Sequence, residues 1–501
     1  MKPWVVIISA LLLGLSPELH GSGKADKIDQ LLTALSIDES FSGVVLVAER
    51  GDIIYHRAFG LANREWGIQN TVSTKFKIGS VSKPFTAMLC LQLVSEGLLD
   101  LKGTISDYLP EFTGESADRI TIEHLLTHTS GIRCSAENEA VVERLSHKPS
   151  DFIKYIEDER LLFAPGEGFS YSNLGYCLLA LIAERVSGVS FGELLERYIF
   201  RPLKMNETKQ YDASLVEQCI ASGYEYNLLD GFRCSSWIDP SYALGCGGLI
   251  STAYDLLCFD KALYTNELIP DHLKEKMFSP SKSGNYGYGW EISTIKINDM
   301  NDSLRVYSHT GSINGFGAYI ARIENDSLFV TVLKNHRSDT YISPAYAPQI
   351  GRWIISVLYG EDINIPKTSI AKKLGLIIGD SGIEDAVSEY YFLKQKEAGS
   401  YNFEEPELNK LGIELYFRFK KPKEALRIFE VNMHEYPCSY NTYDSYAFIL
   451  KETGDYSNAV RYYKKGLDIL QKYPGENDSE SIQQDAENAQ KFINEFEAGS
   501  K

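Results

Sequence analysis

The feature that most constrains this chain is an apolar run, Pro84–Val94, that follows a serine and a lysine three residues apart, Ser80 and Lys83. The run contains no charged residue, so a helix formed there has no face suited to water and must be buried. Pro84 suits the first turn of such a helix, where a missing N–H costs nothing, and Gly97 suits its end. The chain must therefore fold around a buried helix that begins near Ser80.

Ser80 and Lys83 are spaced for shared chemistry. Residues three apart on a helix lie on one face, so both side chains would point the same way at the N-terminal end. That end carries unpaired N–H groups and partial positive charge, which favour loss of the serine proton. Ser80 is therefore a candidate nucleophile. The alternative is an ordinary N-cap serine with a lysine in the first turn, because Ser-x-x-Lys is common by chance.

Size and charge narrow the possible classes of protein. The chain has 501 residues, 44% of them hydrophobic, which is enough for two or more domains. A net charge of −18 without a long basic block argues against a nucleic-acid partner.

The eight cysteines show no Cys-x-x-Cys spacing, so zinc and redox chemistry are not expected, although Cys219 and Cys234 could pair in an oxidising compartment. No nucleotide or flavin motif is present, and we expect no cofactor.

Residues 1–23 have the composition of an export signal. Lys2 precedes an apolar stretch, Trp4–Leu15, that is too short to span a bilayer comfortably, and small residues follow at Gly21–Gly23. We therefore expect an exported protein, periplasmic or extracellular, with no stable membrane span in the mature chain. An uncleaved membrane anchor is the alternative, because an Ala-x-Ala cleavage site is lacking.

Two further polar clusters stand next to predicted elements. Tyr171 and Asn173 lie in a loop just before an apolar helix, Cys177–Val186, and could both face one cleft; alternatively Tyr171 is a packed aromatic residue and Asn173 an N-cap. His309-Thr310-Gly311-Ser312 ends a predicted strand, and an edge strand there could offer charge and free N–H groups to a ligand. A surface histidine near a turn is the alternative for His309.

Two other patterns do not support the chemistry they suggest. His124 and His128 are four residues apart, as in a zinc helix, but Leu125 stands where a glutamate is expected and no third ligand is evident, so we expect no metal. Gly188–Gly192 matches Gly-x-Ser-x-Gly, yet a helix rather than a strand precedes it. Ser190 is instead expected to open the next helix in a capping box with Glu193.

The C-terminal part changes in composition. Ala425 and Ala459 are 34 residues apart, as are Phe429 and Tyr463, which is the tetratricopeptide period. We therefore predict tetratricopeptide-like helical repeats at 401–490, after a linker or helical segment at 363–400, of which residues 383–400 would supply a flanking helix pair. An irregular helical tail is the alternative. Such repeats could dock a protein partner.

Ser80-Val81-Ser82-Lys83, Tyr171-Ser172-Asn173 and His309-Thr310-Gly311 occur in the order and approximate spacing of one family. On these motifs the region 24–362 resembles a class C β-lactamase or a penicillin-binding-protein-type serine hydrolase. Leu125–Gly131 and Gly247–Asp255 resemble it as well, and five weak motifs in the right order are specific together. The resemblance implies an α+β fold, with an antiparallel sheet flanked by helices and a mainly helical subdomain. The predicted strands at both ends and helices in the middle agree with it.

The resemblance also implies roles for individual residues. Ser80 would attack a carbonyl carbon and form an acyl-enzyme, Lys83 would keep the serine proton mobile, and Tyr171 would act as general base and then as acid on the leaving group. Asn173 would bind the substrate amide. Backbone N–H groups of Ser80 and Ser312 would form the oxyanion hole, within a substrate-binding strand made of His309, Thr310, Gly311 and Ser312.

One departure from the family pattern bears on the substrate. Many lactam-cleaving members carry lysine where this chain has His309, and a histidine is a weaker anchor for a substrate carboxylate. We therefore expect a small-molecule or peptide substrate of the amide, D-amino-acid peptide or ester class rather than efficient β-lactam hydrolysis. The alternative is a binding or sensor protein that uses the hydrolase-like domain for its ligand and the repeats for a partner.

Overall fold

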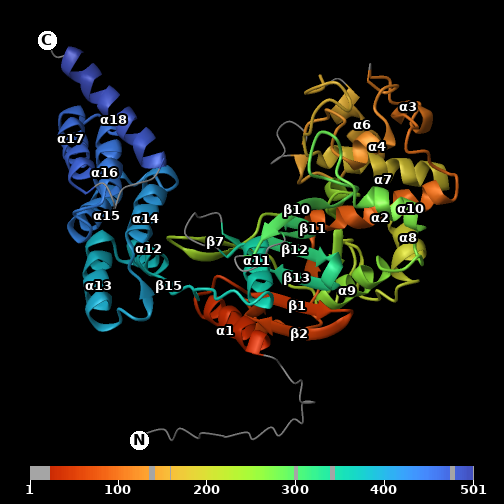
Figure 1. The fold of residues 1–501 in the computed structure, drawn as a ribbon, viewed down its shortest axis with the longest axis horizontal. Coiled ribbons are helices and arrows are strands. Elements are labelled where there is room, and N and C mark those ends of the chain that lie inside the picture. The colour runs from red at the N-terminus through yellow and green to blue at the C-terminus, as the bar shows by residue number, and fades with distance from the viewer. Residues whose placement is uncertain are drawn as a thin grey trace, which may run out of the picture.

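A six-stranded antiparallel sheet organises the N-terminal part of the molecule (Figure 1). The computed structural model describes residues 23–499 except 115, 135–141, 158–159, 298–302, 339–344 and 474–479, so the predicted export signal lies outside the described residues apart from its last position. The strand order is β10-β11-β12-β13-β1-β2. These strands are β1 (Gly43–Glu49), β2 (Asp52–Phe59), β10 (Glu291–Lys296), β11 (Ser303–Ile313), β12 (Phe316–Ile323) and β13 (Leu328–Lys334).

The two ends of the predicted hydrolase region meet in this sheet. Strand β1 pairs with β13 from Gly43 opposite Lys334 to Glu49 opposite Leu328. Side chains alternate between the two faces of a strand, and β1 is buried on both of them. Its even-numbered residues, such as Val44 and Leu46, join the core on the helical side. Its odd-numbered residues pack with α1 (Gly23–Ile37) and α11 (Ala347–Leu358) on the other side.

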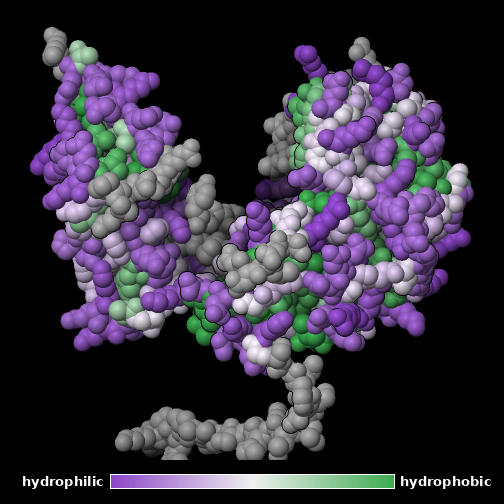
Figure 2. All heavy atoms as spheres, viewed as in Figure 1, coloured by the Kyte–Doolittle hydropathy of each residue, from purple (hydrophilic) through white to green (hydrophobic). Residues whose placement is uncertain are grey.

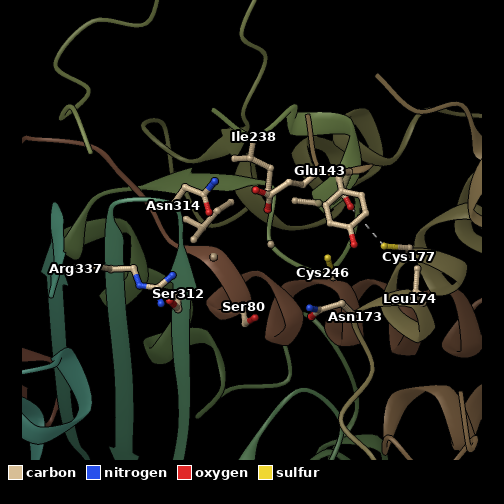
Figure 3. A pocket seen from close by; sticks show the side chains of 15 residues that line it. Ser80, Glu143, Asn173, Leu174, Cys177, Ile238, Cys246, Ser312, Asn314 and Arg337 are labelled. Atoms are coloured by element: carbon tan, nitrogen blue, oxygen red, sulfur yellow. Dashed lines mark hydrogen bonds between the residues drawn. The ribbon is translucent and has the colours of Figure 1, made fainter. Parts of the chain in front are cut away.

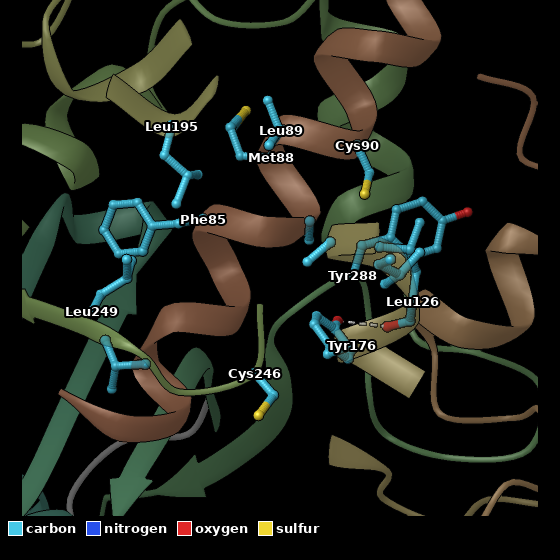
Figure 4. Close-up of a cluster of buried hydrophobic side chains, with 14 of the residues drawn as sticks. Phe85, Met88, Leu89, Cys90, Leu126, Tyr176, Leu195, Cys246, Leu249 and Tyr288 are labelled. Carbon is cyan, nitrogen blue, oxygen red and sulfur yellow. Dashed lines mark hydrogen bonds between the residues drawn. The ribbon is translucent and has the colours of Figure 1, made fainter. Parts of the chain in front are cut away.

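The buried helix predicted from Pro84–Val94 is α2 (Lys83–Ser95), and every residue from Lys83 to Leu93 is buried. It continues from a short 3₁₀ turn, Gly79–Ser82. Figure 4 shows α2 surrounded by apolar side chains from several elements. Phe85 stacks on Phe259 with ring centroids 4.2 Å apart, which fixes α2 against α9 (Ala253–Ala262).

Helices form most of the region between the two sets of strands, as the sequence predicts. They are α3 (Ile105–Tyr108), α4 (Ile122–Leu126), α6 (Pro149–Glu157), α7 (Asn173–Ser187), α8 (Phe191–Leu195) with a π turn (Glu196–Phe200), α9 and α10 (Asp271–Met277). Short strands connect them: β3 (Leu61–Asn63), β4 (Ile68–Gln69), β5 (Phe76–Lys77), β6 (Lys209–Gln210) and β9 (Leu249–Ser251). The α+β fold, with its antiparallel sheet and an all-α C-terminal region, is therefore confirmed.

No single helix of the described chain is long and apolar enough to cross a membrane. One pair, Asn173–Ser187 with Phe191–Phe200, passes the length and composition test together, but it bends by 80° at its break.

Two local predictions require correction. Ser190 stands at the start of α8, but its side chain makes no capping bond; the Phe191 N–H donates instead to Glu184 Oε1 at 2.7 Å. The pairing considered for Cys219 and Cys234 does not form, because both are exposed thiols. The Cys234 thiol donates instead to a Glu65 carboxylate oxygen at 3.0 Å.

The C-terminal region is a stack of antiparallel helices that share one hydrophobic core (Figure 1). The face of this stack seen in Figure 2 is mostly hydrophilic. Residues one predicted repeat apart, such as Ala425 and Ala459, are equally buried. The tetratricopeptide assignment and the domain limits stay predictions. The helices are α12 (Ile370–Asp380), α13 (Ile383–Lys396), α14 (Glu405–Phe417), α15 (Pro422–Glu435), α16 (Tyr440–Glu452), α17 (Tyr456–Lys472) and α18 (Glu480–Gly499).

Segment 363–400 is more than a linker, because α12 and α13 contribute to the core of the C-terminal stack and also contact the hydrolase region. Strands β7 (Tyr224–Asn227) and β8 (Gly231–Cys234) form a hairpin whose tip residues Leu228 and Leu229 belong to that core. Lys372 of α12 donates to Asp38 at 2.8 Å, with both side chains largely buried. The same hairpin pairs in parallel with β14 (His336–Ser338).

The packing of α12 on the hairpin leads to a first prediction. A Cβ added at Gly379 would lie 2.0 Å from the carbonyl oxygen of Leu229. Gly379→Ala should therefore lower the free energy of unfolding of the C-terminal region by about 1–3 kcal/mol, the usual cost of overpacking, although alanine favours helix. Gly399→Ala is the matched control, because nothing lies within 4 Å of an added Cβ there. Chemical denaturation followed by circular dichroism measures both; equal stabilities would contradict this packing.

Candidate active site

Ser80 lies where α2 begins, directly against strand β11. Gly79 has φ +51°, and a Cβ added to it would lie 2.9 Å from the backbone nitrogen of Ser312. A Cβ on Gly311 would lie 2.0 Å from the carbonyl oxygen of Ile78. Both positions therefore need glycine, because only backbone without side chains can approach this closely. These two glycines therefore let the turn that holds Ser80 pack directly against the backbone of Ser312.

Lys83 is completely buried, and its ammonium group is fully engaged. Its Nζ donates to Ser80 Oγ at 3.1 Å, to Asn173 Oδ1 at 2.8 Å and to the Cys246 carbonyl at 2.8 Å. An ammonium has three donors, and here each has an acceptor. Ser80 Oγ accepts from Lys83, so its own hydrogen is left for a different acceptor. Asn173, oriented through its oxygen, keeps its NH₂ group for other contacts.

Tyr171 is the acceptor placed to take that hydrogen. Its hydroxyl lies close enough to Ser80 and Lys83 for both to affect its pKa, and the Lys83 Nζ lies 4.7 Å from its ring centroid. Burial raises the pKa of Tyr171, while the Lys83 charge and the two hydrogen bonds act in the opposite direction. Ser172 caps α7 by accepting from the Gly175 N–H at 3.0 Å, so the alternative that Asn173 is the cap is wrong.

His128 holds Tyr171 in place from behind. Its Nδ1 accepts from the Ser172 N–H at 3.0 Å, and its ring packs on Tyr171 with centroids 4.3 Å apart. The residue is fully buried and has φ +58°, a conformation uncommon outside glycine. Burial lowers the pKa of His128 well below its usual value, helped by the charge of Lys83. His128, which is spaced from His124 as in a zinc helix, is therefore a neutral ring that packs against Tyr171.

His309 differs from its predicted role. Its ring has no exposed surface, so it cannot anchor a substrate as the sequence suggested. Nδ1 lies 2.8 Å from the Thr310 carbonyl and Nε2 lies 2.7 Å from the Tyr286 hydroxyl. A carbonyl can only accept, so Nδ1 carries the hydrogen and Nε2 accepts from Tyr286. Burial, and then the charge of Lys83, lowers the pKa of His309 to about 3.

The backbone of β11 beside Ser80 lacks a neighbour on one side. Strand β11 is not an edge strand along its length, because β10 pairs with Ser303–Ser308, but this pairing stops before His309. From His309 to Ile313 only β12 pairs with β11 among the described strands. The half-buried Thr310 and exposed Ser312 lie on this segment. The Ser312 N–H therefore lies next to Gly79 and Ser80, where a two-donor oxyanion hole would form.

A cavity of about 230 Å³ opens beside Ser80 (Figure 3). Of the predicted site residues, Ser80, Asn173 and Ser312 line it, whereas Tyr171 and His309 do not. Other residues on its walls carry no signal in the sequence. Cys246 belongs to the glycine-rich stretch noted above, but nothing in the sequence marks Glu143, Ile238, Asn314 or Arg337 as neighbours of Ser80.

A family model described as beta-lactamase matches residues 28–346 of this sequence. The chain belongs to the beta-lactamase family. Its relatives include penicillin-binding protein 4* of Bacillus subtilis, which is 30% identical over 465 residues, covering 87% of this chain and 99% of the relative. Esterase EstB of Burkholderia gladioli is 30% identical over 308 residues, covering 54% of this chain and 78% of the relative.

Solved structures of the beta-lactamase family agree with the fold. An octameric penicillin-binding protein homologue from Pyrococcus abyssi superimposes with a TM-score of 0.58 at 25% identity, covering 70% of this chain and 80% of that one. The resemblance stated from the motifs is therefore confirmed at the level of family and fold. Within the described residues, no group of three or more His, Cys, Asp or Glu side chains could hold a metal ion.

Burial of His309 gives this family member a pH-dependent stability. The pKa falls from 6.5 in the unfolded chain to about 3 in the folded one. Between these values the unfolded state binds more protons, so the contribution is present above pH 6.5 and is lost as pH falls toward 3. From pH 7 to pH 5 this residue alone should cost about 2 kcal/mol of unfolding free energy.

Urea denaturation at pH 7 and pH 5 measures this effect. His309→Asn should lose about 2 kcal/mol less than the native chain over that interval. His434→Asn is the control for the loss of a histidine, because the His434 side chain is 76% exposed. Identical pH dependence in the native chain and His309→Asn would show that His309 is not the buried neutral ring described.

Proposed function

We propose that this chain is an exported serine hydrolase that forms an acyl-enzyme on Ser80. The observation that carries the proposal is the fully hydrogen-bonded Lys83 ammonium, which donates to Ser80 Oγ. Tyr171 lies beside both groups, where it can accept the serine proton. A serine hydroxyl is a weak nucleophile at neutral pH unless a neighbouring group takes its proton. Ser80, Lys83 and Tyr171 supply that arrangement in a buried, low-dielectric setting.

The first half of the reaction follows from these contacts. Tyr171 acts in its phenolate form, which the buried Lys83 charge stabilises. It takes the Ser80 proton as Oγ attacks the substrate carbonyl carbon, and it becomes a neutral phenol. The negative carbonyl oxygen is held by the N–H groups of Ser80 and Ser312. Tyr171 then returns the proton to the leaving nitrogen or oxygen, and the carbon–heteroatom bond breaks. Attack by water on the resulting ester releases the acid and regenerates Ser80.

We propose amides, D-amino-acid peptides or esters as the substrate class, in preference to β-lactams. His309 supports this, because a buried neutral ring supplies no positive charge on the Tyr171 side of the nucleophile. The relatives' names include both a penicillin-binding protein and an esterase. Export is proposed from the apolar stretch after Lys2. A protein partner for the C-terminal helices is proposed from their 34-residue period.

Covalent labelling tests the nucleophile. The purified protein is incubated with a fluorescent penicillin and, separately, with a fluorophosphonate, and its intact mass is measured. We expect a fluorophosphonate adduct that is absent from Ser80→Ala, with slower labelling by the penicillin. Ser82→Ala, two residues away, is the control and should keep the adduct. No adduct from folded native protein with either reagent would refute the hydrolase function and favour the binding or sensor role.

A second variant tests the assignment of the base. Tyr171→Phe removes the proton acceptor and should slow fluorophosphonate labelling of Ser80 by about 10²–10⁴-fold, the usual contribution of a general base. Tyr254→Phe is the control, because Tyr254 is half exposed and outside the cavity. Unchanged labelling in Tyr171→Phe would assign the role of base to a different residue.

A further inference from the structure

The walls of the cavity beside Ser80 carry two opposite charges that nothing neutralises. Among the described residues that line it, Glu143 and Arg337 are the only ones with formal charges. Neither side chain makes an ion pair or hydrogen bond with the described part of the chain. The two groups are also farther apart than an ion pair, which requires 4.0 Å or less. Unpaired opposite charges facing one small cavity favour a ligand that bridges them.

Arg337 is exposed, and its backbone is fixed on one wall of the cavity. It lies on β14, opposite Glu225 in the parallel pairing with β7. The turn before it is fixed by buried Asn335, whose Nδ2 donates to the carbonyls of Leu61 at 2.9 Å and Ser222 at 3.0 Å. Figure 3 shows Arg337 reaching into the cavity beside Ser312. A guanidinium whose backbone is fixed on a strand can bind a carboxylate through two parallel hydrogen bonds.

Glu143 is fixed on a different wall by its backbone. Its carbonyl accepts from the Asp239 N–H at 2.8 Å, next to Ile238, which also lines the cavity. The following residues are anchored by the His147 N–H, which donates to Ser241 Oγ at 2.8 Å. Figure 3 shows Glu143 near Ile238, on a different side of Ser80 from Arg337. A half-buried carboxylate in this position would accept hydrogen bonds from an ammonium.

The cavity lies beside the oxyanion-hole residues and not beside Tyr171. Tyr171, which would protonate the leaving group, does not line it, whereas the oxyanion-hole residues Ser80 and Ser312 do. The leaving group therefore departs toward Tyr171, and the cavity receives the acyl group.

We infer that the acyl half of the substrate is zwitterionic, with a carboxylate bound by Arg337 and an ammonium bound by Glu143. This inference rests on the proposed function for the identity of the acyl side. The chemical class is an amino-acid-like acyl group whose free amino and carboxyl groups are both remote from the bond that is cleaved. A cavity of about 230 Å³ has room for one such residue.

Four small amides form a matched set that separates the two charges. D-glutamine carries both, glutaramate only the carboxylate, 4-aminobutanamide only the ammonium, and butanamide neither. Calorimetry of each with the native protein gives dissociation constants that do not depend on turnover. We expect D-glutamine to bind about 10–100-fold more tightly than either singly charged amide, because each charged hydrogen bond contributes at about that level, and we expect butanamide to bind most weakly.

Charge-removing variants assign each end of the ligand. Glu143→Gln should abolish the preference for D-glutamine over glutaramate, which lacks only the ammonium. Arg337→Gln should abolish the preference for D-glutamine over 4-aminobutanamide, which lacks only the carboxylate. Glu267→Gln and Arg119→Gln, at exposed positions outside the cavity, should keep both preferences. Equal affinities for all four amides, or preferences that survive in the cavity variants, would overturn the inference. Fluorophosphonate labelling of Ser80 in the same samples reports separately on the proposed function.

Discussion

The buried Lys83 ammonium is the constraint on which the rest of the site depends. Removing a charge this completely from water is expensive unless it is well hydrogen-bonded, and here three acceptors from three segments surround it. Satisfying Lys83 forces the α2 turn, the start of α7 and the backbone of Cys246 to converge on one point. The hydrogen bonds that stabilise the buried Lys83 cation thus also set the positions of the groups around Ser80. The rings of His128 and His309 are neutral, so they add no second positive charge near Lys83.

Much of the fold could be predicted because its signals are local or periodic. The uncharged run after Ser80 identified α2, and the strands expected at both ends of the hydrolase region are found in the central sheet. The closeness of Ser80, Lys83 and Asn173 followed from family motifs rather than from spacing alone. The capping box at Ser190 does not form, and the Phe191 N–H in the same turn donates to Glu184 of the preceding helix.

The cavity walls could not be predicted, for a physical reason. Glu143 and Arg337 are nearly two hundred positions apart in the chain, and only the tertiary fold brings them to one cavity. The burial of His309 could not be predicted either, because the sequence does not show that the Tyr286 hydroxyl lies against its ring. A single polar residue in a strand looks the same whether it faces solvent or a packed interior.

The pairing of β1 with β13 has a consequence for how the chain acquires its structure. Residues separated by nearly three hundred positions must meet before the central sheet can form, so long-range contacts dominate and folding is expected to be slow. Leu228 and Leu229 stay uncovered even longer, because the helix that shields them begins at Ile370. During synthesis the nucleophile would thus be assembled only after most of the chain exists, and until then apolar strands are open to misassociation or to binding by a chaperone.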